Sequence, residues 1–92
     1  MQIKETPTFG KQVKRLHANQ KADLDQAVRD VLANPFIGEA KKGDLAGVRV
    51  HKFRLVGQLA LLAYEVCPDQ ESLILHAIGS HENFYRDLKQ KR

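Results

Sequence analysis

The fold is decided by residues 48–66, which have the sequence VRVHKFRLVGQLALLAYEV. Apolar and polar residues alternate from Val48 to Leu55, and this alternation is typical of a β-strand with one buried face. Residues 56–58 contain a glycine between the two apolar runs and indicate a tight turn. Residues 59–66 are apolar on both faces, which is typical of a central strand. The stretch therefore predicts a β-hairpin at the centre of a sheet.

The alternation in the first of these strands changes phase at its middle. The apolar positions are Val48 and Val50 in the first half, but Phe53 and Leu55 in the second half. A β-bulge near residues 51–52 would explain the change, because one extra residue reverses the faces that the following side chains occupy. We therefore expect a bulged strand.

Working outward, residues 73–78 predict a further strand, which Gly79 and Ser80 end, and residues 82–91 predict a helix. Because short turns link the last three strands, we expect them to form an antiparallel meander. Residues 36–47, with three glycines, predict a loop before the hairpin.

Two helices and one strand are expected at the N-terminal end. Residues 2–7 predict a short edge strand. A first helix follows, with Thr8 as its N-cap and an apolar face made by Phe9, Val13 and Leu16. A second helix begins after a break at residues 17–20 and stops at Asn34, because a residue that precedes proline avoids the helical conformation.

The predicted fold is a single α+β domain over residues 1–92, with the element order β-α-α-β-β-β-α. We expect the antiparallel sheet to carry the N-terminal helical hairpin on one face and a short C-terminal helix after the last strand. The opposite face would then remain partly open and would carry the cationic side chains of the hairpin.

All of the net charge lies between Lys41 and Arg54. This window holds five basic residues against Asp44 and so carries +4, whereas the other 78 residues hold ten basic and ten acidic side chains. A concentrated cationic stretch suits the phosphates of a nucleic acid, because binding releases their counterions; a solvated strand face is the alternative. The residues of this window that could bind a nucleic acid are Lys41, Lys42, Arg49, His51, Lys52 and Arg54.

A second group of candidate residues follows the last strand, in residues 79–86 with the sequence GSHENFYR. His81 would lie at the rim of the sheet and can exchange a proton near neutral pH. Phe84 and Tyr85 can stack on an unstacked base, and Arg86 can offset phosphate charge. The structural alternative is a solvated His81 and a Phe84 packed in the core.

The remaining residues indicate no other chemistry. His76 is interpreted as a buried, hydrogen-bonded histidine, and the lone Cys67 as structural. The four histidines and one cysteine have no metal-ligand spacing, so we expect no metal and no cofactor. A chain without a signal peptide or a long apolar run is expected in the cytoplasm, away from membranes.

The order of these features resembles the RelE/ParE superfamily, the toxins of type II toxin–antitoxin systems. The resemblance covers nearly the whole chain. Residues 45–55 are similar to the basic strand of the family, residues 61–66 to its central strand, and residues 79–85 to the Gly-x-His and aromatic ending of YafQ-like members.

The resemblance to the nuclease branch implies a metal-independent endoribonuclease that cleaves mRNA on the ribosome and arrests translation. It implies that Lys52 and Arg54 hold the phosphate and stabilise the transition state. His81 would act as general acid or base, and Tyr85 or Phe84 would lie near the scissile nucleotide. RelE itself has an arginine in its central strand, near the position of Leu61 here, so this chain would need Arg49, His51 or Arg86 to compensate.

The resemblance leaves the target open. RelE-like members act on mRNA in the ribosome, whereas ParE-like members poison DNA gyrase without catalysing a reaction. A non-toxic interaction domain is a third interpretation. All three imply a cognate antitoxin as the partner, with an acidic or amphipathic segment that covers the cationic face.

Overall fold

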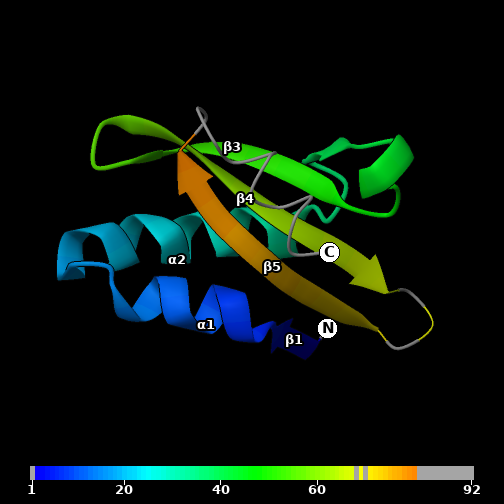
Figure 1. Ribbon diagram of the computed structural model, residues 1–92, viewed down its shortest axis with the longest axis horizontal. Helices are drawn as coiled ribbons and strands as arrows, with labels where there is room; N and C mark the ends of the chain where they lie inside the picture. The colour runs from blue at the N-terminus through cyan, green and yellow to red at the C-terminus, as the bar shows by residue number, and fades with distance from the viewer. Residues whose placement is uncertain (1, 68, 70, 81–92) are drawn as a thin grey trace.

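The computed structural model describes residues 2–67, 69 and 71–80 of the chain (Figure 1). Its elements are β1 (Gln2–Glu5), α1 (Pro7–Lys14), α2 (Ala18–Ala33), β2 (Glu39–Ala40), the 3₁₀-helix η1 (Gly43–Leu45), β3 (Arg49–Leu55), β4 (Gln58–Cys67) and β5 (Ser72–Ser80). The predicted C-terminal helix at residues 82–91 lies outside the described residues. None of the helices in the described part of the chain has the length and apolar character needed to cross a membrane.

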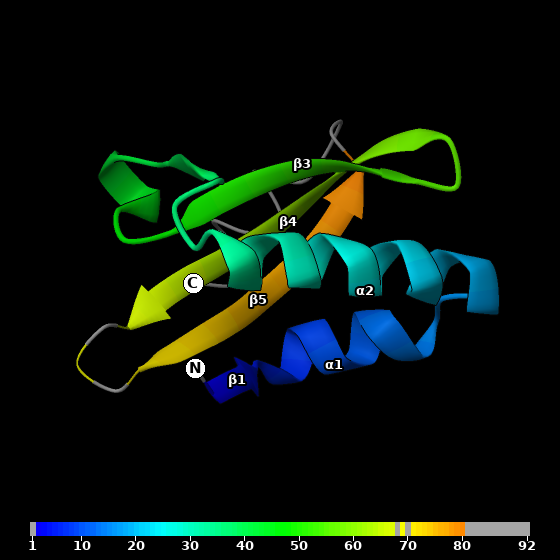
Figure 2. The same ribbon diagram turned by 180° about the vertical axis from the view of Figure 1, so that it is seen from behind.

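The five strands form one sheet with the order β1-β5-β4-β3-β2. Strands β3 to β5 pair in the antiparallel manner that the sequence predicts. Strand β2, which was not predicted, pairs with β3 in the antiparallel direction, and β1 adds to β5 in the parallel direction. Both helices lie on one side of the sheet (Figure 2). This side is called the helical face below, and the opposite side the far face. The α+β class and the order of the described elements are confirmed.

Helix α1 begins earlier than the sequence predicts. Its N-cap is Thr6, whose hydroxyl accepts a hydrogen bond from the backbone N–H of Phe9 at 3.1 Å. Pro7 then occupies the first helical position, where its missing N–H is not needed. The prediction of Thr8 as the cap is therefore wrong. The Thr6 hydroxyl also donates to the carbonyl of His76 at 2.8 Å, which ties the helix start to β5.

The tight turn between β3 and β4 is confirmed. Leu55 pairs with Gln58, and both turn residues have positive φ, 50° at Val56 and 81° at Gly57. Positive φ at both central positions is the geometry whose twist matches that of the flanking strands. The N–H of Val56 donates to a carboxylate oxygen of Asp23 at 2.8 Å, so α2 holds the turn in place.

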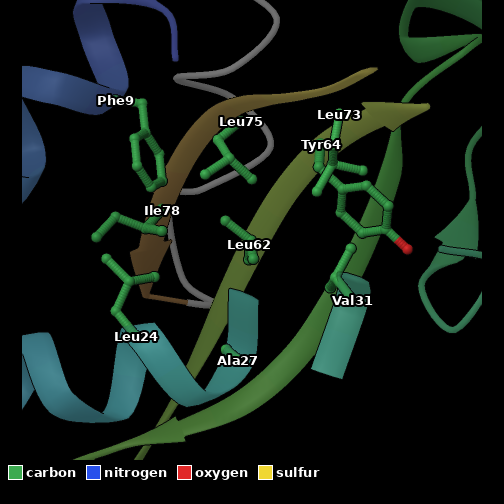
Figure 3. Packing of buried hydrophobic residues seen from close by; sticks show 9 residues of the cluster. All are labelled: Phe9, Leu24, Ala27, Val31, Leu62, Tyr64, Leu73, Leu75 and Ile78. Atoms are coloured by element: carbon green, nitrogen blue, oxygen red, sulfur yellow. The ribbon is translucent and has the colours of Figure 1, made fainter. Parts of the chain in front are cut away.

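The main hydrophobic core lies between the helices and the helical face (Figure 3). Leu62 of β4 lies at its centre and is fully buried. The side chains packed around it come from α1, α2, β4 and β5; they are Phe9, Leu24, Ala27, Val31, Tyr64, Leu73, Leu75 and Ile78. The apolar face predicted for the first helix, made by Phe9, Val13 and Leu16, is the face that packs here.

A second, smaller hydrophobic cluster lies on the far face, and it explains why β3 does not have the predicted bulge. Its residues are Leu45, Val48, Val50, Leu61, Ala63 and Ala77. The pairing of β3 with β4 is continuous from Arg49 to Leu55, so no bulge interrupts β3. The phase changes because different layers cover the two ends of the strand. Val50 is buried on the far face beneath η1, whereas Phe53 packs toward the helices.

The bulge of this sheet is in β5. Ala63 pairs with Ala77, but the next residue of β4, Tyr64, pairs with Leu75. His76 is therefore the extra residue, and it keeps the apolar residues on both sides of it in register with β4. A bulge bends and twists the strand that carries it.

The segment before β3 is held by side chains of the sheet. The Tyr64 hydroxyl donates to the carbonyl of Pro35 at 2.8 Å and accepts from the N–H of Gly38 at 2.9 Å. A Cβ on Gly38 would lie 2.6 Å from that hydroxyl, so only glycine fits this approach. The predicted loop at residues 36–47 thus contains β2 and η1 and is well packed at Gly38.

Candidate nucleic-acid interface

Lys52 and Arg54 project together from the far face. They lie opposite Leu61 and Leu59 on β4, and directly paired residues of antiparallel strands point to the same side of the sheet. Both cations are exposed, and they are two residues, about 7 Å, apart along β3. The sequence prediction that they share one face away from the helices is confirmed.

The preceding segment adds Lys41 to the same side. Glu39 pairs with Val50, a far-face residue, and the Lys41 ammonium lies 3.2 Å from the Glu39 carboxylate. Lys41 is thus partly neutralised by its neighbour. Lys42 is exposed on the loop that follows β2. Within β3 and the described segment that precedes it, the cationic side chains on the far face are therefore Lys41, Lys52 and Arg54.

Arg49 lies on the other side of the sheet, where it organises the loop. Its guanidinium donates to the carbonyl of Gly38 at 2.8 Å and to that of Phe36 at 3.4 Å. The same group lies 4.8 Å from the centre of the Phe36 ring, within the range of a cation–π contact. Arg49 and Lys52 therefore lie on opposite faces of the sheet, because β3 lacks the predicted bulge that would bring them to one face.

His51 also lies on the helical face, stacked on Phe53 with 6.3 Å between the ring centres. Burial lowers the pKa of the His51 imidazole below its ordinary value of 6.5, and the Asp30 carboxylate raises it by a smaller amount. Like Arg49, His51 therefore lies on the face opposite to that of Lys52. Contact of either residue with nucleic acid stays a prediction.

We expect His51 to make folding less favourable below neutral pH. The unfolded imidazole takes up a proton near pH 6.5, whereas the folded one does so only at lower pH, so acidification favours the unfolded chain through that interval. Urea unfolding should therefore show that the wild-type chain loses stability relative to His51→Gln as pH falls from 7.5 to 5.5. The measured quantity is the free energy of unfolding of the wild-type chain minus that of the variant. Parallel pH profiles for the two proteins would contradict this assignment.

His76 and Glu65 form a pair that was predicted from the sequence only in part. The Nε2 atom of His76 lies 2.9 Å from a carboxylate oxygen of Glu65, and both side chains are partly buried. The interpretation of His76 as a buried, hydrogen-bonded histidine is confirmed for the hydrogen bond, but its side chain is only partly buried. Its partner was not predicted, because the bulge that brings His76 toward Glu65 leaves no mark in an apolar strand sequence.

The remaining predicted site residues, His81, Phe84, Tyr85 and Arg86, lie outside the described residues. Their roles stay predictions. Ser80, the last described residue, ends β5 at an exposed position. It pairs with Ala60, and the preceding Gly79 pairs with Leu61, the residue opposite Lys52. The described part of β5 therefore ends two strands away from Lys52 on β3.

A family model described as the ParE-like toxin of type II bacterial toxin–antitoxin systems matches residues 3–89. The chain belongs to this family of toxins. No curated protein sequence matches the toxin.

Solved structures of related toxins share the fold of this ParE-like toxin. A doubly substituted E. coli RelE in the free state has a TM-score of 0.74 and 17% identity, over 98% of this chain and 95% of RelE. The YoeB/ParE toxin from Agrobacterium tumefaciens has a TM-score of 0.71 and 22% identity, over 88% and 99%. The RelBE2 toxin–antitoxin complex from Mycobacterium tuberculosis contains a chain with a TM-score of 0.67 and 18% identity, over 87% and 96%. At these identities the likeness concerns the fold alone.

Proposed function

We propose that this toxin is a ribosome-dependent mRNA endonuclease that acts without a metal ion and arrests translation. The observation that carries the proposal is the exposed pair Lys52 and Arg54 on the far face, directed away from the helices. Because neither residue belongs to the two ion pairs described above, their charges are available to a phosphate. Because the proposed activity requires the ribosome, we expect the toxin to act in the cytoplasm.

The chemistry is an intramolecular displacement. A base removes the proton from a ribose 2′-hydroxyl, and the 2′-oxygen forms a bond to the adjacent phosphorus. The bond from phosphorus to the 5′-oxygen then breaks, and an acid protonates that leaving oxygen. The products are a 2′,3′-cyclic phosphate and a 5′-hydroxyl. Lys52 and Arg54 stabilise the negative charge that grows on the phosphate, which is an electrostatic contribution to catalysis.

His81 and Tyr85 complete this proposal. His81 moves a proton to or from the reacting oxygens, and Tyr85, or its neighbour Phe84, packs against the scissile nucleotide. General acid–base help of this kind contributes roughly 10²–10⁴-fold to the rate.

A gyrase poison is the second candidate, because the matching family model is named for ParE-like toxins. In that case the far-face cations would contact the enzyme or its DNA, and no residue of the chain would need to catalyse a reaction. Under either proposal the partner in the resting cell is an antitoxin, as in the RelBE complexes whose toxins share this fold.

One experiment separates the two candidates. The chain is induced in growing cells, mRNA 5′ ends are mapped, and purified protein is added to a gyrase supercoiling assay. The nuclease proposal predicts new 5′ ends within translated codons, lost in His81→Ala and Tyr85→Ala, with supercoiling unaffected. Intact mRNA together with inhibited supercoiling would overturn it in favour of the gyrase target.

A further inference from the structure

The connection between α2 and β2 presents an exposed aromatic ring at one end of the molecule (Figure 2). The ring belongs to Phe36, which is 63% exposed and takes no part in either hydrophobic cluster. Single apolar side chains on a protein surface are ordinary. Phe36 differs from an ordinary surface residue because side chains of the sheet hold the backbone on both sides of it.

The groups that hold this backbone come from β3 and β4. The carbonyl of Phe36 accepts from Arg49 at 3.4 Å. The hydroxyl of the fully buried Tyr64 donates to the carbonyl of Pro35 and accepts from the N–H of Gly38. A ring whose backbone is fixed in this way loses little conformational freedom when it binds a partner, so less of the binding energy is spent on ordering it.

The ring of Phe36 has one covered face and one open face. The guanidinium of Arg49 lies 4.8 Å from the ring centre and covers the first face. The second face is open to solvent, as the exposure of the residue requires. A flat aromatic face of this kind is the surface on which unstacked nucleobases stack, and a cation at the same place adds to that binding.

The charges beside the ring favour an anionic partner. Residues 39–42 are extended, and Ala40 pairs with Arg49, so alternation places Lys42 on the same side of the sheet as Arg49. Lys42 is exposed there. Glu39, the acid of this segment, lies on the opposite side in an ion pair with Lys41. A nucleotide carries both a flat base and a phosphate, and therefore matches this surface better than an apolar peptide does.

We propose that Phe36 is a stacking platform for an unstacked base of a single-stranded nucleic acid, with Lys42 on a neighbouring phosphate. The platform lies on the helical side of the sheet, whereas Lys52 and Arg54 project from the far face. It is therefore a second nucleic-acid contact, separate from the proposed site of cleavage. The proposal goes beyond the proposed function, because binding at this platform requires no reaction.

The first test uses a fluorescent ring at the platform. The chain has no tryptophan, so Phe36→Trp introduces a single reporter. A 2′-O-methyl octaadenylate, which has no 2′-hydroxyl to react, is expected to quench its emission in a saturable manner, whereas an abasic strand of the same length should not. The matched control is Ile37→Trp at the next position, which is 45% exposed and should show no quenching.

The second test measures affinity for the same strand by fluorescence anisotropy. Phe36→Ala is expected to weaken binding at least about fivefold, and Phe36→Tyr to keep the affinity of the wild-type chain. Lys42→Gln should lower the slope of log affinity against log salt by about one. A deoxyadenylate of equal length, used in parallel, shows whether RNA or DNA is bound more tightly. Circular dichroism confirms that each variant is folded.

Two results would overturn the proposal. One is equal affinity of Phe36→Ala and the wild-type chain, and the other is equal quenching, or none, of tryptophan at positions 36 and 37. Failure of the proposed function is recognised separately: induction of the wild-type chain would then produce no new mRNA 5′ ends, while Phe36→Trp would still be quenched by the unreactive strand.

Discussion

Replacement of both Lys52 and Arg54 by alanine is expected to reduce mRNA cleavage by at least about 10²-fold and to abolish growth arrest. Removal of one preplaced donor to a developing oxyanion commonly costs on the order of 10²–10³-fold in rate. The fold should remain intact, because both side chains are exposed and Arg54 makes only a 3.3 Å bond to the carbonyl of Gly57. The measurement is the rate of mRNA cleavage in a reconstituted translation reaction, together with growth after induction.

The matched control for this double variant is Lys21→Ala with Arg29→Ala. These two cations are exposed on α2, on the helical side of the molecule, and their removal changes the net charge by the same amount. The control should keep full activity. If both double variants were equally active, or equally impaired, the far face would have no special role.

The largest expected effect on stability is that of Leu62→Ala, with a loss of about 2–5 kcal/mol in the free energy of unfolding. Leu62 is 0% exposed and lies between α2 and the sheet, so the truncated side chain leaves a cavity that rigid neighbours fill only in part. A domain of this size is stable by only about 5–15 kcal/mol, so the variant is expected to be close to unfolding in the cell. Urea denaturation followed by circular dichroism measures the loss.

Leu59→Ala is the control on the same strand. It removes the same atoms from a side chain that is 41% exposed, and it should cost well under half as much as Leu62→Ala. Equal losses from the two substitutions would show that the core of β4 is not arranged as described.

Much of the fold was predictable because local signals agree with the tertiary structure. The Val56–Gly57 turn, the apolar run of β4 and the proline after Asn34 each fix a boundary by backbone chemistry alone. Thr6 was missed in favour of Thr8, although Pro7 directly after Thr6 is a residue type favoured at the first helical position. The hydrogen bonds to Phe9 and His76 identify Thr6 as the cap.

The side-chain directions on β3 could not be predicted from alternation. The change of phase at Val50 and Phe53 has two possible causes, an extra residue or a change in the covering layer. Only the position of η1 against Val50 decides between them. The position of Arg49 could not be predicted for the same reason. A charge count groups Arg49 with Lys52, but its guanidinium donates to the carbonyls of residues 36 and 38 on the other side of the sheet.

The position of Lys52 and Arg54 on β3 has a consequence for how such toxins diverge. Phe53 between them packs against the main core, while the two cations contribute no atoms to either hydrophobic cluster. Substitutions at positions 52 and 54 are therefore expected to cost little stability. The surface that these positions form can change while the fold stays the same. Under the proposed function, a few substitutions at these exposed positions would be enough to change the cellular target without changing the fold.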